Sequence, residues 1–118
     1  MKKAVAKTDL LVLRDRIRAV AKERNWERLD TPRNLATALC VEAAELLEPF
    51  QWLMTGDLSE LQEDKLIHIR EEMADVLIYL IALADKLETD LFAATIQKLD
   101  VIREKYPVEK ATSHFNRS

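Results

Sequence analysis

Two pairs of carboxylates stand at helical spacing within stretches that are otherwise apolar. Glu42 and Glu45 lie within ATALCVEAAELLEPF, and Glu72 and Asp75 lie within EEMADVLIYLIALA. On an α-helix this spacing places both side chains of a pair on one face, about one turn apart. Acidic side chains are seldom buried without a partner, and the nearby cations are too few to neutralise these acids. The sequence therefore predicts a divalent metal ion bound by Glu42, Glu45, Glu72 and Asp75.

The predicted donor set is oxygen only, which favours Mg²⁺, with Mn²⁺ as a substitute. Zinc would call for Cys or His beside the acids, and a di-iron bundle needs a Glu-x-x-His motif, which this sequence lacks. His68 precedes Glu71 in the reverse order, and we expect it on a helix surface. A hard cation with positions open to water and substrate is typical of phosphoryl chemistry.

Other charged residues have simpler interpretations. We expect Glu23, Glu27, Glu60, Glu63 and Asp64 to lie on solvated helix faces. Basic residues of the last predicted helix could either approach phosphate groups or form an ordinary solvated face, and the sequence leaves both interpretations open. These residues are Lys98, Arg103 and Lys105.

Aromatic residues are scarce, and their positions matter. Trp26 and Trp52 lie at the ends of predicted helices, where they could stack on a nucleobase or pack against the core as staples. Tyr79 follows Asp75 by one helical turn, so it shares a face with the second acid pair. We therefore expect Tyr79 on the substrate side of the site.

The composition predicts an all-α protein. One Gly and three Pro among 118 residues, with 48% hydrophobic and 33% charged residues, favour long helices in one domain. We expect residues 8–107 to be ordered and residues 108–118 to form a polar, mobile tail. Capping residues are expected at Thr8 or Asp9, at Thr31, and at Thr89 or Asp90. Pro49 and Gly56 mark a turn. The helices are predicted over 9–25, 32–48, 60–87 and 91–105, and they would form an antiparallel four-helix bundle, completed by oligomerisation, with the acids facing inward.

The sequence argues against several function classes. The formal net charge of −3 offers no basic footprint for a nucleic-acid polymer. The apolar run from Val76 to Ala84 is far shorter than the ~20 residues that span a bilayer, and no export signal is recognised, so we expect a cytoplasmic protein without a membrane partner. The single cysteine, Cys40, has apolar neighbours and is expected in the core.

The acid pattern has a family resemblance. Glu42-x-x-Glu45, a 26-residue interval and Glu72-x-x-Asp75 resemble the signature of the all-α nucleoside triphosphate pyrophosphohydrolases of the MazG type. The segments RNWERLDTPRNLATALCVEAAELLEPFQW, EEMADVLIYLIALA, KLD and KYP resemble the dCTP pyrophosphatase branch of that family, over roughly residues 10–110.

The resemblance implies hydrolysis of a nucleoside triphosphate, dCTP or a related pyrimidine deoxynucleotide, to the monophosphate and pyrophosphate. It implies Mg²⁺ and a homo-oligomer, either a dimer or a tetramer. By position, the four acids would bind the metal, and Glu45 and Glu72 would be catalytic, with Glu45 orienting the attacking water. The substrate-binding residues it implies are Trp26, Trp52 and Tyr79 around the base and sugar, Asn34 and Gln51 as polar contributors, and Lys98 and Tyr106 near the phosphates.

The sequence departs from the family pattern at Val41, Lys86 and Ile102, where many members carry Glu, Arg and Asn. Lysine cannot make the bidentate phosphate contact of arginine, and isoleucine offers no amide hydrogen bond, so base preference is the least determined property. The alternatives to an enzyme are a nucleotide-binding bundle without turnover and a purely structural helical bundle.

Overall fold

The computed structural model describes residues 7–106 and residue 108, and no strand occurs among them. The all-α prediction is confirmed. The chain forms two compact units, Met1–Glu88 and Thr89–Ser118, which are described separately. The first unit holds α1 (Asp9–Glu23), α2 (Pro32–Leu47), the short 3-10 helices η1 (Glu48–Phe50) and η2 (Leu58–Glu60), and α3 (Glu63–Lys86); the second holds α4 (Leu91–Lys105).

The predicted caps explain where three of the helices begin. The Thr8 hydroxyl accepts a hydrogen bond from the Leu11 amide at 3.3 Å, and the Thr31 hydroxyl accepts one from the Asn34 amide at 3.2 Å. Pro32 occupies the first position of α2, where a missing amide hydrogen is harmless. Each cap satisfies an amide group that the first helical turn leaves without a partner.

The C-terminus of α1 has a Schellman motif, in which Asn25 adopts the left-handed conformation with φ of 56°. The Asn25 amide donates to the Lys22 carbonyl at 3.2 Å, and the Trp26 amide donates to the Ala21 carbonyl at 2.9 Å. The chain then turns again, because the Leu29 and Asp30 amides both donate to the Trp26 carbonyl. This compact connection fixes Trp26 beside the end of α1.

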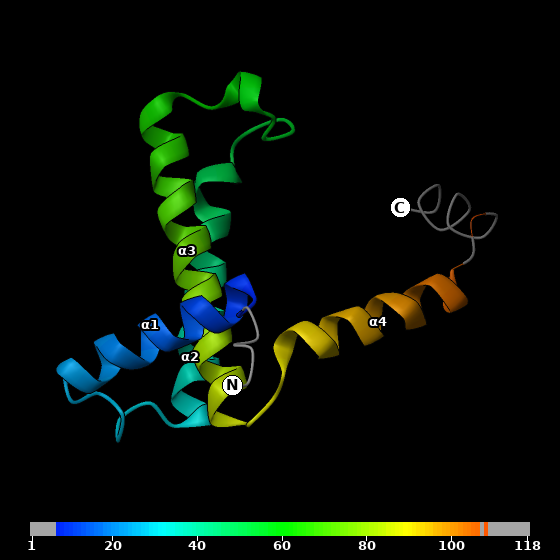
Figure 1. The fold of residues 1–118 in the computed structure, drawn as a ribbon. Coiled ribbons are helices and arrows are strands. Elements are labelled where there is room, and N and C mark those ends of the chain that lie inside the picture. The colour runs from blue at the N-terminus through cyan, green and yellow to red at the C-terminus, as the bar shows by residue number, and fades with distance from the viewer. Residues whose placement is uncertain (1–6, 107, 109–118) are drawn as a thin grey trace. The chain divides into compact units, whose positions relative to one another are not determined.

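The helices α2 and α3 lie side by side and run antiparallel, and α1 packs crosswise against α3 (Figure 1). Among the described residues, the buried apolar side chains are Leu35 of α2 and Ile69, Ile81 and Ala84 of α3. This small core joins the hairpin along the stretch that carries the acids. The four-helix bundle completed by a second subunit stays a prediction.

The connection from α2 to α3 differs from the prediction at Glu60. The helix α3 begins at Glu63 instead of residue 60, because Glu60 belongs to η2 and its carboxylate closes the preceding loop. That carboxylate accepts hydrogen bonds from the amides of Met54, Thr55 and Gly56 at 2.9, 2.8 and 3.0 Å. It also accepts one from the Thr55 hydroxyl at 2.8 Å. The expectation that Glu60 lies on a solvated helix face is therefore wrong.

The expected core position of Cys40 is also wrong, since the side chain is exposed. The side chains of α2 that are buried or half-buried form a stripe that includes Leu35, Leu39, Glu42 and Leu46. Cys40 lies outside this stripe. Apolar neighbours in sequence do not bury a helical residue that points away from the partner helix.

The second unit begins with a cap at Asp90, whose carboxylate accepts a hydrogen bond from the Ala93 amide at 2.9 Å. Along α4, each residue from Phe92 to Lys105 is exposed. The predicted polar tail lies outside the described residues, apart from Val108. None of the described helices is long and apolar enough to cross a membrane.

Candidate active site

The antiparallel hairpin of α2 and α3 brings carboxylates from both helices together. Glu42, Glu45 and Glu72 each offer an oxygen atom, and these three atoms all lie within 4.8 Å of one another. The spacing along α2 aligns Glu42 with Glu45, and the pairing of the helices brings Glu72 against them. Glu72 is the one charged residue of the described chain that is buried, at 8% exposure.

Crowding of like charges perturbs this cluster. The neighbouring Glu72 carboxyl raises the pKa of Glu42, and burial and the negative charge of Asp75 add to the rise. The neighbouring Glu42 carboxyl raises the pKa of Glu45. Carboxylates that share a site disfavour each other's ionised form, so the cluster is under electrostatic stress at neutral pH.

The cluster also fits a divalent cation. The Oε2 atoms of Glu42 and Glu72 are buried and have no hydrogen-bond partner. Buried acceptors are normally satisfied, and an all-oxygen donor set suits a hard divalent ion. His68, exposed as predicted, places Nε2 3.8 Å from Glu72 Oε1. The carboxylate oxygens on α2 and α3 could thus hold a metal ion.

Asp75, the fourth predicted ligand, lies one turn beyond Glu72 on α3 and outside the tight group of three. Its negative charge nevertheless contributes to the raised pKa values of both Glu42 and Glu45. Asp75 also lines a cavity beside the cluster. It therefore connects the acidic centre to that cavity.

The cavity has a volume of about 660 Å³ and lies between α1, the connection after it, α2 and α3. Its walls are largely apolar, with two aromatic residues, Trp26 and Tyr79, among them. Such a mostly apolar hollow with a few polar groups is typical of a small-molecule site. The lining residues include Leu13, Ile17, Val20, Leu35, Leu77 and Ile78.

Tyr79 lines the cavity and is also influenced by the charges of the acidic cluster. Burial raises the pKa of the Tyr79 hydroxyl, and the negative charges of Glu42, Asp75 and Asp30 add to the rise. The side chain lines the cavity from α3, on the same helical face as Asp75. The structure thus brings Tyr79 and Trp26 to one cavity next to the acidic cluster.

The other predicted substrate residues of the first unit lie elsewhere. Trp52 is 92% exposed in the connection after α2 and does not line the apolar cavity. Gln51 is exposed in the same connection. The Asn34 amide side chain donates to the Leu29 carbonyl at 2.8 Å, so it stabilises the loop that carries Trp26.

Lys98 and Tyr106 belong to the second unit, where Tyr106 follows the end of α4. Lys105 places its ammonium group 5.5 Å from the centre of the Tyr106 ring. Lys98 is exposed on α4, as is Ile102. Their predicted contacts with phosphate stay predictions.

Sequence reasoning missed two charged residues of the cavity wall, Arg16 and Asp30. Asp30 lies between the helices predicted over 9–25 and 32–48, and its half-buried side chain lines the apolar cavity. Its position two residues before Pro32 carries a signal for a helix start and none for a cavity. Only the folding of the loop over α3 brings it there.

Comparisons with known proteins agree with this geometry. The family described as MazG-like matches residues 37–116. The chain is 44% identical over 90 residues to dCTP pyrophosphatase 1 of Rattus norvegicus, covering 75% of this chain and 53% of the relative. It is 42% identical over 95 residues to dCTP pyrophosphatase 1 of Homo sapiens, covering 79% and 56%. The chain thus spans about half the length of these curated relatives.

A solved structure is similar over nearly the whole fold. The crystal structure of a pyrophosphatase from Archaeoglobus fulgidus aligns with a TM-score of 0.78 at 37% sequence identity. The alignment covers 90% of this chain and 99% of that chain.

Proposed function

Because the chain belongs to the MazG-like family, we propose that it is a metal-dependent nucleoside triphosphate pyrophosphohydrolase. Its substrate is dCTP or a related pyrimidine deoxynucleoside triphosphate, and its products are the monophosphate and pyrophosphate. The observation that carries the proposal is the cluster of Glu42, Glu45 and Glu72, which lies next to an apolar cavity bordered by Asp75. The likeness to pyrophosphatases supports it.

The carboxylates Glu42, Glu45, Glu72 and Asp75 would hold the metal, which we propose is Mg²⁺, with Mn²⁺ able to replace it. When bound, the ion neutralises phosphate charge and lowers the pKa of a water molecule. Without it, four carboxylates would repel a polyphosphate. This arrangement makes the activity depend entirely on the metal.

Glu45 and Glu72 are the catalytic carboxylates in this proposal. Glu45 would orient the attacking water and accept its proton. Water attacks the α-phosphorus, the bond from that phosphorus to the oxygen bridging to the β-phosphorus breaks, and pyrophosphate leaves with that oxygen. Glu72 is buried in the hairpin and, in this proposal, holds the carboxylates of α2 and α3 in position relative to one another.

The apolar cavity receives the base and sugar. Trp26 offers an aromatic face for stacking, and Tyr79 lies on the wall that continues to Asp75. Lys98 and Tyr106 contact the phosphates in this proposal. Trp52 and Gln51 contact the substrate at the edge of the site, and Asn34 acts through the loop that it stabilises.

We also propose that the protein works as a homo-oligomer, a dimer or a tetramer. Phe92, Ile96 and Leu99 of α4 recur at helical spacing and are each about half exposed. Cys40 and Val41 likewise lie on an exposed face of α2. Pairing of subunits would cover such faces. Light scattering should give a mass of two or four times 13.6 kDa, and a mass of 13.6 kDa would contradict the proposal.

The test is product analysis of the purified protein with Mg²⁺ and a panel of ribo- and deoxynucleoside triphosphates. We expect monophosphate and pyrophosphate, the fastest turnover with a pyrimidine deoxynucleotide, and no product after chelation of the metal. Diphosphate with phosphate would contradict the bond assignment. Saturable nucleotide binding without any product would identify a non-catalytic binding protein instead.

A further inference from the structure

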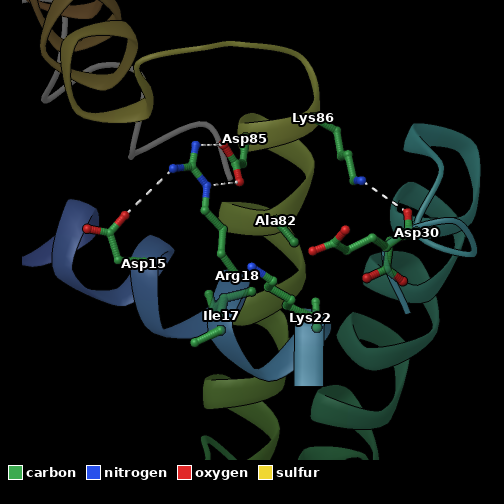
Figure 2. Close-up of a pocket in the computed structure, with 11 residues that line it drawn as sticks. Asp15, Ile17, Arg18, Lys22, Asp30, Ala82, Asp85 and Lys86 are labelled. Carbon is green, nitrogen blue, oxygen red and sulfur yellow. Dashed lines mark hydrogen bonds and ion pairs between the residues drawn. The ribbon is translucent and has the colours of Figure 1, made fainter. Parts of the chain in front are cut away.

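Asp30 lies where two hollows of the first unit meet. The apolar cavity of about 660 Å³ adjoins a charged hollow of about 510 Å³ between α1, the connection after it and the end of α3. The residues that line both are Ile17, Ala21, Asp30 and Ala82. Asp30 is therefore the one polar side chain of this shared wall, and Figure 2 labels it among the residues that line the charged hollow.

The loop holds Asp30 by its backbone and leaves the carboxylate open. The Asp30 amide donates to the Trp26 carbonyl at 3.0 Å, so one turn positions both residues. Within the described part of the chain, no hydrogen bond or ion pair engages the Asp30 carboxylate. The nearby Lys86 ammonium donates instead to the Glu27 carbonyl at 3.1 Å, and Arg18 binds Asp85 (Figure 2).

A half-buried carboxylate in an apolar cavity needs a hydrogen-bond donor to offset its lost hydration. It is stabilised by a donor that enters with the ligand, and it repels a ligand atom that carries lone pairs. Trp26 lies at the start of the same turn and offers a stacking surface in the same cavity. A stacked base would therefore meet Asp30 with its polar edge and not with its face.

We propose that Asp30 selects the nucleobase by accepting a hydrogen bond from its exocyclic amino group. The inference rests on the proposed function and specifies its substrate: cytosine, which carries this donor, is favoured over uracil and thymine, which carry a carbonyl oxygen at that position. Carboxylates pair with the cytosine amino group in the same way when proteins read base edges. The name of the relatives, dCTP pyrophosphatase, agrees with this choice.

The test compares kcat/KM for dCTP and dUTP, with Mg²⁺, in the parent protein, in Asp30→Asn and in Glu27→Gln. Glu27 is the matched control, because it belongs to the same connection but lines only the charged hollow. We expect the parent to prefer dCTP by about tenfold or more. Asp30→Asn should bring the ratio close to one, since its amide can also donate to a carbonyl oxygen. Glu27→Gln should keep the parental ratio.

A parent protein that cleaves dUTP as well as dCTP would overturn the inference, as would an Asp30→Asn protein that keeps the parental ratio. If Asp30→Asn does not fold, Asp30→Ser replaces it, with circular dichroism as the check of folding. Absence of pyrophosphate from every nucleotide would instead overturn the proposed function, and this inference with it. The two failures are therefore distinguishable.

Discussion

Glu60 and the cluster of Glu42, Glu45 and Glu72 belong to the same helical hairpin, yet their surroundings are opposite. Glu60 accepts hydrogen bonds from the amides of Met54, Thr55 and Gly56 and from the Thr55 hydroxyl, and these bonds lower its pKa to about 2. In the cluster, neighbouring carboxyl groups raise the pKa values of Glu42 and Glu45.

The difference separates a structural carboxylate from one available for chemistry. Glu60 receives four hydrogen bonds from donors of its own loop. The cluster brings acceptors together without donors, and two buried Oε2 atoms have no partner. Buried acceptors without donors are rare in folded proteins, so these carboxylates are a group that could hold a cation.

The largest expected effect concerns activity. Glu45→Gln and Glu72→Gln should each lower kcat/KM for pyrophosphate release by about 100-fold or more, because each removes a carboxylate that we propose binds the metal or accepts the water proton. Glu60→Gln should change it by less than about threefold, since its carboxylate serves only the loop. Steady-state kinetics on folded variants measures both. Parental rates in Glu45→Gln would show that the site assignment is wrong.

The next effect concerns metal binding to the folded protein. At a Mg²⁺ concentration about 100 times Kd, the ion should add about 2.7 kcal/mol to the free energy of unfolding. Glu72→Gln should lose this stabilisation, whereas Glu60→Gln should retain it. Thermal unfolding with and without Mg²⁺, with Ca²⁺ and Mn²⁺ for comparison, gives the shifts. An unchanged Tm in the parent protein would favour the structural bundle.

A smaller effect is expected at Gly56, which shapes the loop around Glu60. Gly56 has φ of 79°, and an added Cβ would lie 2.7 Å from Cδ1 of Phe50. Gly56→Ala should therefore lower the free energy of unfolding by about 1–3 kcal/mol through strain and displacement of the ring. Chemical denaturation measures the loss. Mg²⁺ should still stabilise this variant, and a loss of that response would mean that the loop and the cluster are coupled.

The smallest effect is the pH dependence of Glu60. Its folded pKa of about 2 lies below the ordinary value of 4.5, so its stabilisation is complete above the unfolded pKa and is lost as the pH falls toward 2. The difference in Tm between the parent and Glu60→Gln should be constant above about pH 5 and should narrow toward pH 2. A difference that does not change with pH would show that the hydrogen bonds do not depend on the charge.

The sequence determined the helices because their signals are local. Thr8, Thr31 and Asp90 cap helices as expected, and Pro32 begins α2. The spacing of the acids predicted that Glu42 and Glu45 share a helix face, since a helix fixes the relative direction of residues three apart, whereas Asp75, predicted with them, lies outside the group of three. The expectation for Glu60 failed because its partners come from a loop whose course no helical periodicity describes.

Only the tertiary structure decided what each helical face meets. It placed Glu72 against Glu42 and Glu45, exposed Cys40, and separated Trp26 in the apolar cavity from Trp52 in an exposed connection. It also brought Asp30 to that cavity. Helical periodicity determines which side chains share a face, but contacts between distant segments depend on how the helices cross and how the connections fold over them.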